Sequence, residues 1–235
     1  MKKINIIYLL PEMKGASGGA KVIYNHSLKL NNLKKNISSS VIHLKKKFSY
    51  KIENSLSKKF NIFNEQYSGW NPNKMRVSIF FSPNKNWFNK NVNLKKKFLL
   101  DKNSDFLIIP EIWSHFSEDL ELKKKGINYG IFIQGFYHMN STSNFKKLKS
   151  AYKNAKIILI SSDYNIKCFK EMFPEFKNKI LRINFSINHE KLKISKKTNT
   201  ITYMPRKLPD HSQLLLFYLK NLLPNNWKLV SLNNV

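Results

Sequence analysis

A glycine-containing turn near the start of the chain holds the residues whose types and spacing point most directly to chemistry. The turn, Gly15-Ala16-Ser17-Gly18-Gly19, lies between an apolar run at 4–10 and an amphipathic stretch at 20–33. Such a turn lets backbone amides approach an anionic ligand, and the N-terminus of the following helix adds partial positive charge. It is not a dinucleotide-binding fingerprint, because the G-x-G-x-x-G spacing and a suitably placed acidic residue are both missing. The turn is therefore either a phosphate-binding loop or a tight turn in which glycine serves only the backbone.

The elements that would position this turn alternate between strands and helices. The run at 4–10 is typical of a strand buried on both faces, rather than of a signal peptide. Further strands are predicted at 39–44, 77–81, 106–110, 129–133, 157–160 and 179–183. Helices are predicted at 20–33, 117–125, 144–154 and 163–173, with Ser117 and Ser162 at N-cap positions. This order predicts an α/β fold with a Rossmann-like, doubly wound parallel sheet.

A polar stretch at 189–199 predicts a domain boundary. We expect a first domain at 1–195 and a second at 196–235, the latter built from a strand at 200–204, a helix at 212–223 and a strand at 227–232. Because one β-α-β unit cannot cover both faces of its sheet, the second domain is expected to be incomplete within this sequence.

The net charge of the chain, and the kind of basic residue that supplies it, bear on whether the protein binds nucleic acid. The 235 residues carry a formal net charge of +28, but only Arg76, Arg182 and Arg206 are arginines. Arginine is the residue suited to bidentate contacts with bases and phosphates, and the lysines here are dispersed, so a nucleic-acid partner is disfavoured. A solvated lysine-rich surface is the simplest interpretation. Attraction to anionic lipid or to phosphorylated substrates stays open.

Cysteine and acidic residues argue against metal chemistry. The single Cys168 excludes an intramolecular disulfide and a cysteine-based metal cluster, and no His/Asp/Glu spacing indicates a metal site. No stretch approaches the roughly 20 apolar residues of a membrane-spanning helix. We therefore expect a cytoplasmic protein, with peripheral contact at the inner face of the membrane as an open alternative.

Four segments, taken in order, carry a resemblance to a known family. They are GGAKVIYNHSLKLNNLKKNISSSVIHL (18–44), DFLIIPEIW (105–113), NYGIFIQGFYHM (128–139) and TITYMPRK (200–207). Together they resemble nucleotide-sugar glycosyltransferases of the GT-B class, family 4-like (glycosyl transferases group 1), although Asn36 stands where that family often has Gly-His. The resemblance implies transfer of a sugar from a nucleotide-diphosphate donor to a glycan or lipid-linked acceptor, without a metal ion or other cofactor.

For donor binding, the resemblance implies roles for four residues. Gly18 and Gly19 match the loop that closes near the donor diphosphate. Arg206 and Lys207 match basic residues that contact the donor phosphates, where they would offset charge on the departing nucleotide diphosphate. In a lysine-rich chain, the alternative for this basic pair is two further surface cations.

For the acceptor side, the resemblance points to residues that follow two strands. Gln134, Gly135 and Tyr137 match the segment that reaches the cleft, and Glu111 is a candidate cleft carboxylate or, equally, a surface residue. His138 is a candidate acid–base group, although a histidine in such a position is more often a bystander. No residue is assigned as catalytic.

The same family carries a Glu-x7-Glu stretch in the second half of its donor domain, and that stretch is not found in this sequence. The competing hypothesis is therefore a noncatalytic GT-B half that binds an acceptor or a partner subunit.

Overall fold

The computed structural model describes residues 3–12, 17–33, 36–46, 72, 75–78, 92–135, 144–185, 196–203 and 209–231. The chain divides into two compact units, Met1–Phe185 and Ser186–Val235. The predicted boundary at residue 195 lies outside the described residues and stays a prediction.

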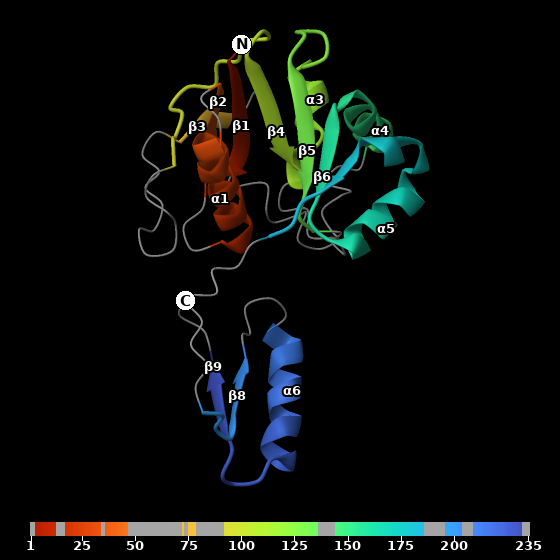
Figure 1. The fold of residues 1–235 in the computed structure, drawn as a ribbon. Helices are drawn as coiled ribbons and strands as arrows, with labels where there is room; N and C mark the ends of the chain where they lie inside the picture. Colours follow the sequence, from red (N-terminus) through yellow and green to blue (C-terminus); the bar gives the residue numbers. More distant parts are fainter. Residues whose placement is uncertain are drawn as a thin grey trace. The chain divides into compact units, whose positions relative to one another are not determined.

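The first unit is built on a seven-stranded sheet with the order β3-β2-β1-β4-β5-β6-β7 (Figure 1). The strands are β1 Ile4–Pro11, β2 Ile37–Lys46, β3 Met75–Val77, β4 Asp105–Pro110, β5 Asn128–Ile133, β6 Ile157–Ile160 and β7 Ile180–Arg182. All neighbours pair in parallel except β2 and β3, which are antiparallel. The Rossmann-like doubly wound fold predicted from the sequence is confirmed, with an antiparallel edge strand added.

Helices cover both faces of this sheet because its strands are apolar on both sides. Along β1, Ile7 and Leu9 join one buried cluster, whereas Tyr8 and Leu10 join the other, as the two-residue period of a strand requires. Helix α1 (Gly18–Leu33) packs in the second cluster. The first cluster holds η2 (Glu111–Trp113), α3 (Phe116–Asp119), α4 (Phe145–Asn154), α5 (Asp163–Met172) and η4 (Pro174–Lys179).

The helix starts were predicted more accurately than one of the helix lengths. The side chain of Asn144 caps α4, and the side chain of Ser162 caps α5 by accepting from the backbone N–H of Asn165 at 3.2 Å. The helix predicted at 117–125 is wrong in its extent, since α3 ends at Asp119 and Ser117 lies inside it. Buried Leu122 is reached through turns rather than through a continued helix.

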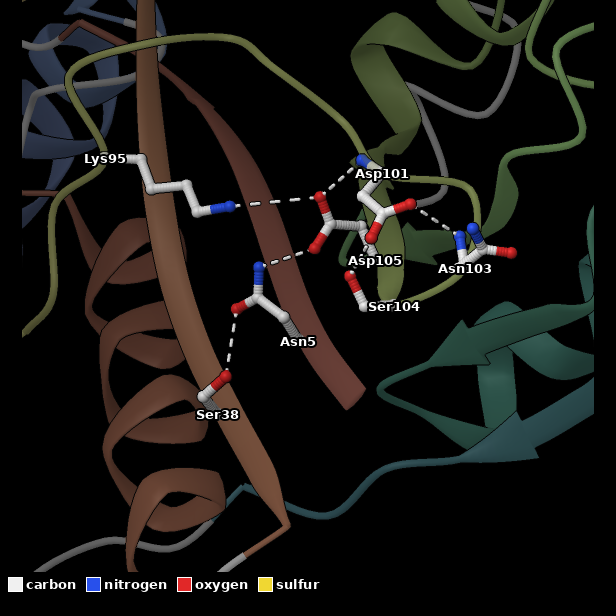
Figure 2. Close-up of polar contacts among 7 residues, drawn as sticks. All are labelled: Asn5, Ser38, Lys95, Asp101, Asn103, Ser104 and Asp105. Atoms are coloured by element: carbon white, nitrogen blue, oxygen red, sulfur yellow. Dashed lines mark hydrogen bonds and ion pairs between the residues drawn. The ribbon is translucent and has the colours of Figure 1, made fainter. Parts of the chain in front are cut away.

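A polar network fixes the edge of the sheet where β1, β2 and β4 begin (Figure 2). Buried Asp105 accepts hydrogen bonds from Asn5 Nδ2 at 2.8 Å and from the backbone N–H of Asp101 at 2.9 Å. Ser38 Oγ donates to Asn5 Oδ1 at 3.3 Å, and Lys95 Nζ lies 4.0 Å from Asp105 Oδ2. The network ties three strands and the preceding loop together at the amino edge of the sheet.

The second unit is a β-α-β arrangement. Strands β8 (Thr200–Tyr203) and β9 (Lys228–Ser231) pair in parallel, and α6 (Pro209–Leu222) connects them. Every residue whose burial is described in this unit is half-buried or exposed. The unit agrees with the strand–helix–strand order predicted beyond residue 196.

Candidate functional site

The candidate site lies where the chain reverses its direction of travel across the sheet. From β1 the chain continues to β2 on one side, and it later returns to β4 on the other side of β1. At such a switch point the two connections diverge, which leaves a crevice at the carboxyl ends of the strands, where doubly wound proteins bind ligands. The residues that follow β1, β4 and β5 are therefore the ones to inspect.

A direct contact joins the first turn of α1, which begins at Gly18 rather than at the predicted residue 20, to the segment after β5. Gln134 Nε2 donates a hydrogen bond to the backbone oxygen of Gly19 at 3.2 Å. A Cβ atom at Gly19 would lie only 2.6 Å from Gln134 Oε1, whereas a Cβ atom at Gly18 would meet nothing within 4 Å. Gly19 thus permits a close approach that no other residue type would allow without movement, and the space beside Gly18 is open.

Glu111 is a buried residue rather than a surface carboxylate, and it links the end of β4 to the segment after β5. Its exposed fraction is 6%, and Oε1 accepts a hydrogen bond from the backbone N–H of Gly135 at 3.1 Å. Burial raises the pKa of Glu111 to about 7, although backbone N–H groups at Glu111, Gln134 and Gly135 act in the opposite direction. The carboxyl group can therefore hold or release a proton near neutral pH while fixing the peptide after β5.

The junction of β6 and α5 supports the same peptide from the other side. The backbone oxygen of Gln134 lies 3.4 Å from Asn165 Nδ2 and 3.5 Å from Ser161 Oγ, both long hydrogen bonds. Asn165 is buried. Sequence reasoning missed both residues, because the only local signal was the N-cap at Ser162.

A buried histidine frames the end of β1 and was also missed. His43 Nδ1 contacts the backbone oxygen of Pro11 at 3.1 Å, and Nε2 lies 2.5 Å from Tyr24 Oη. Burial lowers the pKa of His43 to about 4, despite opposing contributions from the Pro11 carbonyl and Glu12. The neutral imidazole then donates from Nδ1 and accepts from the tyrosine hydroxyl, an assignment made from the hydrogen-bond partners. This pair fixes α1 against β2 near the end of β1.

The remaining predicted residues are not tested by this geometry. Tyr137, His138, Arg206 and Lys207 lie outside the described residues, so their roles stay predictions. Within the described part of the chain, no group of three or more His, Cys, Asp or Glu side chains is placed to hold a metal ion. The described helices include none that is both long and apolar enough to cross a bilayer.

Together these features define an α/β protein with a doubly wound sheet and a cluster of polar contacts at its switch point. Comparison with protein-family models and with curated proteins finds no match. Among solved structures, the chain is similar to the catalytic domain of starch synthase IV from Arabidopsis thaliana, bound to ADP and acarbose. The alignment covers 98% of this chain and 69% of that one, with 8% identity and a TM-score of 0.48.

Proposed function

We propose that this chain is the acceptor-side part of a GT-B glycosyltransferase that moves a sugar from a nucleotide-diphosphate donor to a glycan or lipid-linked acceptor. The observation that carries the proposal is the meeting of Gly19 and Gln134 at the carboxyl edge of the sheet, beside the switch between β1 and β4. Helix N-termini at such edges attract phosphate groups. The four family-like segments supply the further step from a phosphate ligand to sugar transfer.

Each described residue then has a defined task. Gly18 and Gly19 let the start of α1 approach the diphosphate without a side chain between them. Gln134, whose amide bonds to Gly19 in this structure, has a side chain that could turn from Gly19 toward a bound ligand. Glu111 holds the Gly135 peptide in place and acts as a positioning residue. In the second unit, Arg206 and Lys207 would offset the charge of the leaving diphosphate.

A second candidate is a noncatalytic half that binds an acceptor glycan or a partner subunit. It is favoured by the second unit, in which every residue whose burial is described is half-buried or exposed, so that this unit presents a poorly developed core.

Titration of the full chain with nucleotides tests the proposal. UDP, GDP and ADP, each with and without an attached hexose, would be added while backbone amide NMR signals and heats of binding are recorded. We expect one nucleotide to perturb the amides of Gly18, Gly19 and Gly135, and its sugar conjugate to support transfer to a glycan acceptor. Binding of glycans without any nucleotide would favour the noncatalytic candidate. Binding of neither ligand would overturn the glycosyltransferase and the glycan-binding half, and would leave only the half that binds a partner subunit.

A further inference from the structure

A second surface of the first unit lies at the opposite edge of the sheet from the candidate site. The loop before β4 and the loop before β5 both lie where these strands begin (Figure 1). They surround an open depression of about 540 Å³. Its apolar lining comes from both loops and consists of Phe98, Leu99, Leu100, Leu120, Leu122 and Ile127.

The solvent exposure of the apolar lining residues increases from the floor of the depression to its lip. Leu122 and Ile127 are buried at the floor, and Phe98 and Leu100 are half-buried. Leu99 is 72% exposed at the lip. A single exposed leucine needs no explanation, but one that rises from an apolar depression is a group available for insertion into another apolar phase.

The two loops carry six exposed lysines, of which Lys102 and Lys125 line this depression and Lys123 and Lys124 line a separate one. The six are Lys96, Lys97 and Lys102 on the first loop, and Lys123, Lys124 and Lys125 on the second. The same loops carry two exposed acidic residues, Asp101, which accepts hydrogen bonds from Asn103 and Ser104, and Glu121, which pairs with Lys124 at 3.4 Å, so lysines outnumber carboxylates there six to two. The surface therefore combines strong positive charge with an apolar centre.

The loop that carries Leu99 is held in place before any partner arrives. Val41 donates its backbone N–H to Asn93 and accepts from the backbone N–H of Lys95, at 2.8 and 2.9 Å. At the other end of the loop, the Asp105 carboxylate binds the backbone N–H of Asp101 and lies near Lys95 (Figure 2). A loop fixed at both ends loses little conformational freedom on docking.

We infer that this surface docks on an anionic lipid bilayer, with Leu99 entering the interfacial region, Lys102 and Lys125 facing the head groups, and the other lysines of the two loops adding positive charge. Lysine suits such a surface as a point charge, whereas sequence-tolerant nucleic-acid binding uses exposed aromatic side chains for base stacking. Among the residues that line the depression, none is arginine, and Phe98 is half-buried. The inference is independent of the proposed sugar transfer, because the two sites lie at opposite edges of the sheet.

Sedimentation of the full chain with lipid vesicles tests the inference. Vesicles containing phosphatidylglycerol would be compared with vesicles of phosphatidylcholine alone, for the wild type and three variants. The triple variant Lys96→Gln, Lys97→Gln, Lys102→Gln should partition about 100-fold more weakly into anionic vesicles, because each lysine strengthens binding about fivefold. Leu99→Asn should lower partitioning roughly tenfold at unchanged charge.

A matched control separates this surface from the general charge of the chain. The triple variant Lys167→Gln, Lys170→Gln, Lys177→Gln removes equal charge from exposed positions on α5 and η4, and it should partition nearly as the wild type. Equal losses in both triple variants would overturn the inference, because binding would then reflect the +28 net charge alone. The inference would also be overturned if Leu99→Asn partitioned into vesicles as the wild type does. A variant at Lys96, Lys97 and Lys102 that lost binding to single-stranded RNA but kept binding to vesicles would overturn it as well. Unchanged thermal unfolding would show that each variant is folded.

Discussion

Replacing Gly19 by alanine places a methyl group where the side-chain oxygen of Gln134 now lies. The new Cβ atom would meet Gln134 Oε1 at 2.6 Å, whereas ordinary van der Waals contact begins at 3.4 Å. Because the clashing atom ends a flexible side chain, Gln134 can rotate away, and its hydrogen bond to Gly19 is then lost. That loss costs about 0.5–1.5 kcal/mol, and the helix gains about 0.5–1 kcal/mol from alanine. We expect the free energy of unfolding to change by less than about 1 kcal/mol.

The ligand site should respond far more than the stability does. In Gly19→Ala, both the methyl group and the displaced amide occupy the approach to the start of α1, so nucleotide affinity should fall about tenfold or more, which corresponds to about 1.4 kcal/mol. Gly18→Ala also places a methyl group at the start of α1 but keeps the Gln134 contact, since its Cβ atom meets nothing within 4 Å, so the comparison of the two variants isolates the effect of the Gly19–Gln134 contact.

Urea unfolding and nucleotide titration would be carried out on both variants. Equal nucleotide affinities in the two variants would refute the assignment of the Gly19–Gln134 contact to the site. A loss of several kcal/mol of stability in Gly19→Ala would instead refute the reasoning that Gln134 can move.

Four further predictions concern the sheet and its buried polar groups. Gly130→Ala should destabilise the protein by about 2–3 kcal/mol in urea unfolding, since its Cβ atom would lie 2.7 Å from Ile157 Cγ2 and 3.1 Å from the Ile157 backbone oxygen; wild-type stability would contradict the close β5–β6 approach. The pKa of Glu111, about 7 in the folded protein against 4.5 for the free group, means that the folded state keeps a proton that the unfolded chain releases. Stability should therefore fall by up to about 3 kcal/mol as pH rises from 4.5 to 7, and Glu111→Gln should remove that slope in urea unfolding at several pH values. For His43 the sign is opposite: its folded pKa of about 4 lies below 6.5, so its contribution is complete above pH 6.5 and is lost as pH falls toward 4. An imidazole that titrates near 6.5 by NMR would contradict this, and Tyr24→Phe, which removes a hydroxyl 2.5 Å from His43 Nε2, should cost about 1–2 kcal/mol in urea unfolding.

Most strands of the sheet could be predicted because a strand buried on both faces leaves a continuous apolar run. The strand at 157–160 matches β6 at both ends, and the other parallel strands agree within a few residues. The edge strand β3 was harder to predict, since the strand predicted at 77–81 shares only Val77 with it. Its antiparallel direction could not be predicted, because the period of side chains along a strand is the same in either direction.

The candidate site shows a similar division. The glycine turn stood out because Gly18 and Gly19 lie between an apolar run and an amphipathic one, a signal contained within a few residues. The resemblance to glycosyltransferases singled out Gln134 and Gly135, but nothing local indicated what they touch. Asn165 and Ser161, which hold the Gln134 peptide, had no signal of their own.

The sequence by itself determined the order of strands and helices along the chain, the burial of the first strand on both faces, and the position of Gly18 and Gly19 at the start of the first helix, because apolar periodicity and turn chemistry act over a few residues. Only the tertiary structure decided that Gln134 meets Gly19 across 115 positions of the chain and that Glu111 is buried against Gly135. The reason is that the order of strands in the sheet sets which loops meet, and the loss of water around a carboxyl group sets its pKa. Neither the strand order in the sheet nor the burial of a carboxyl group can be read from residues that are neighbours in the chain.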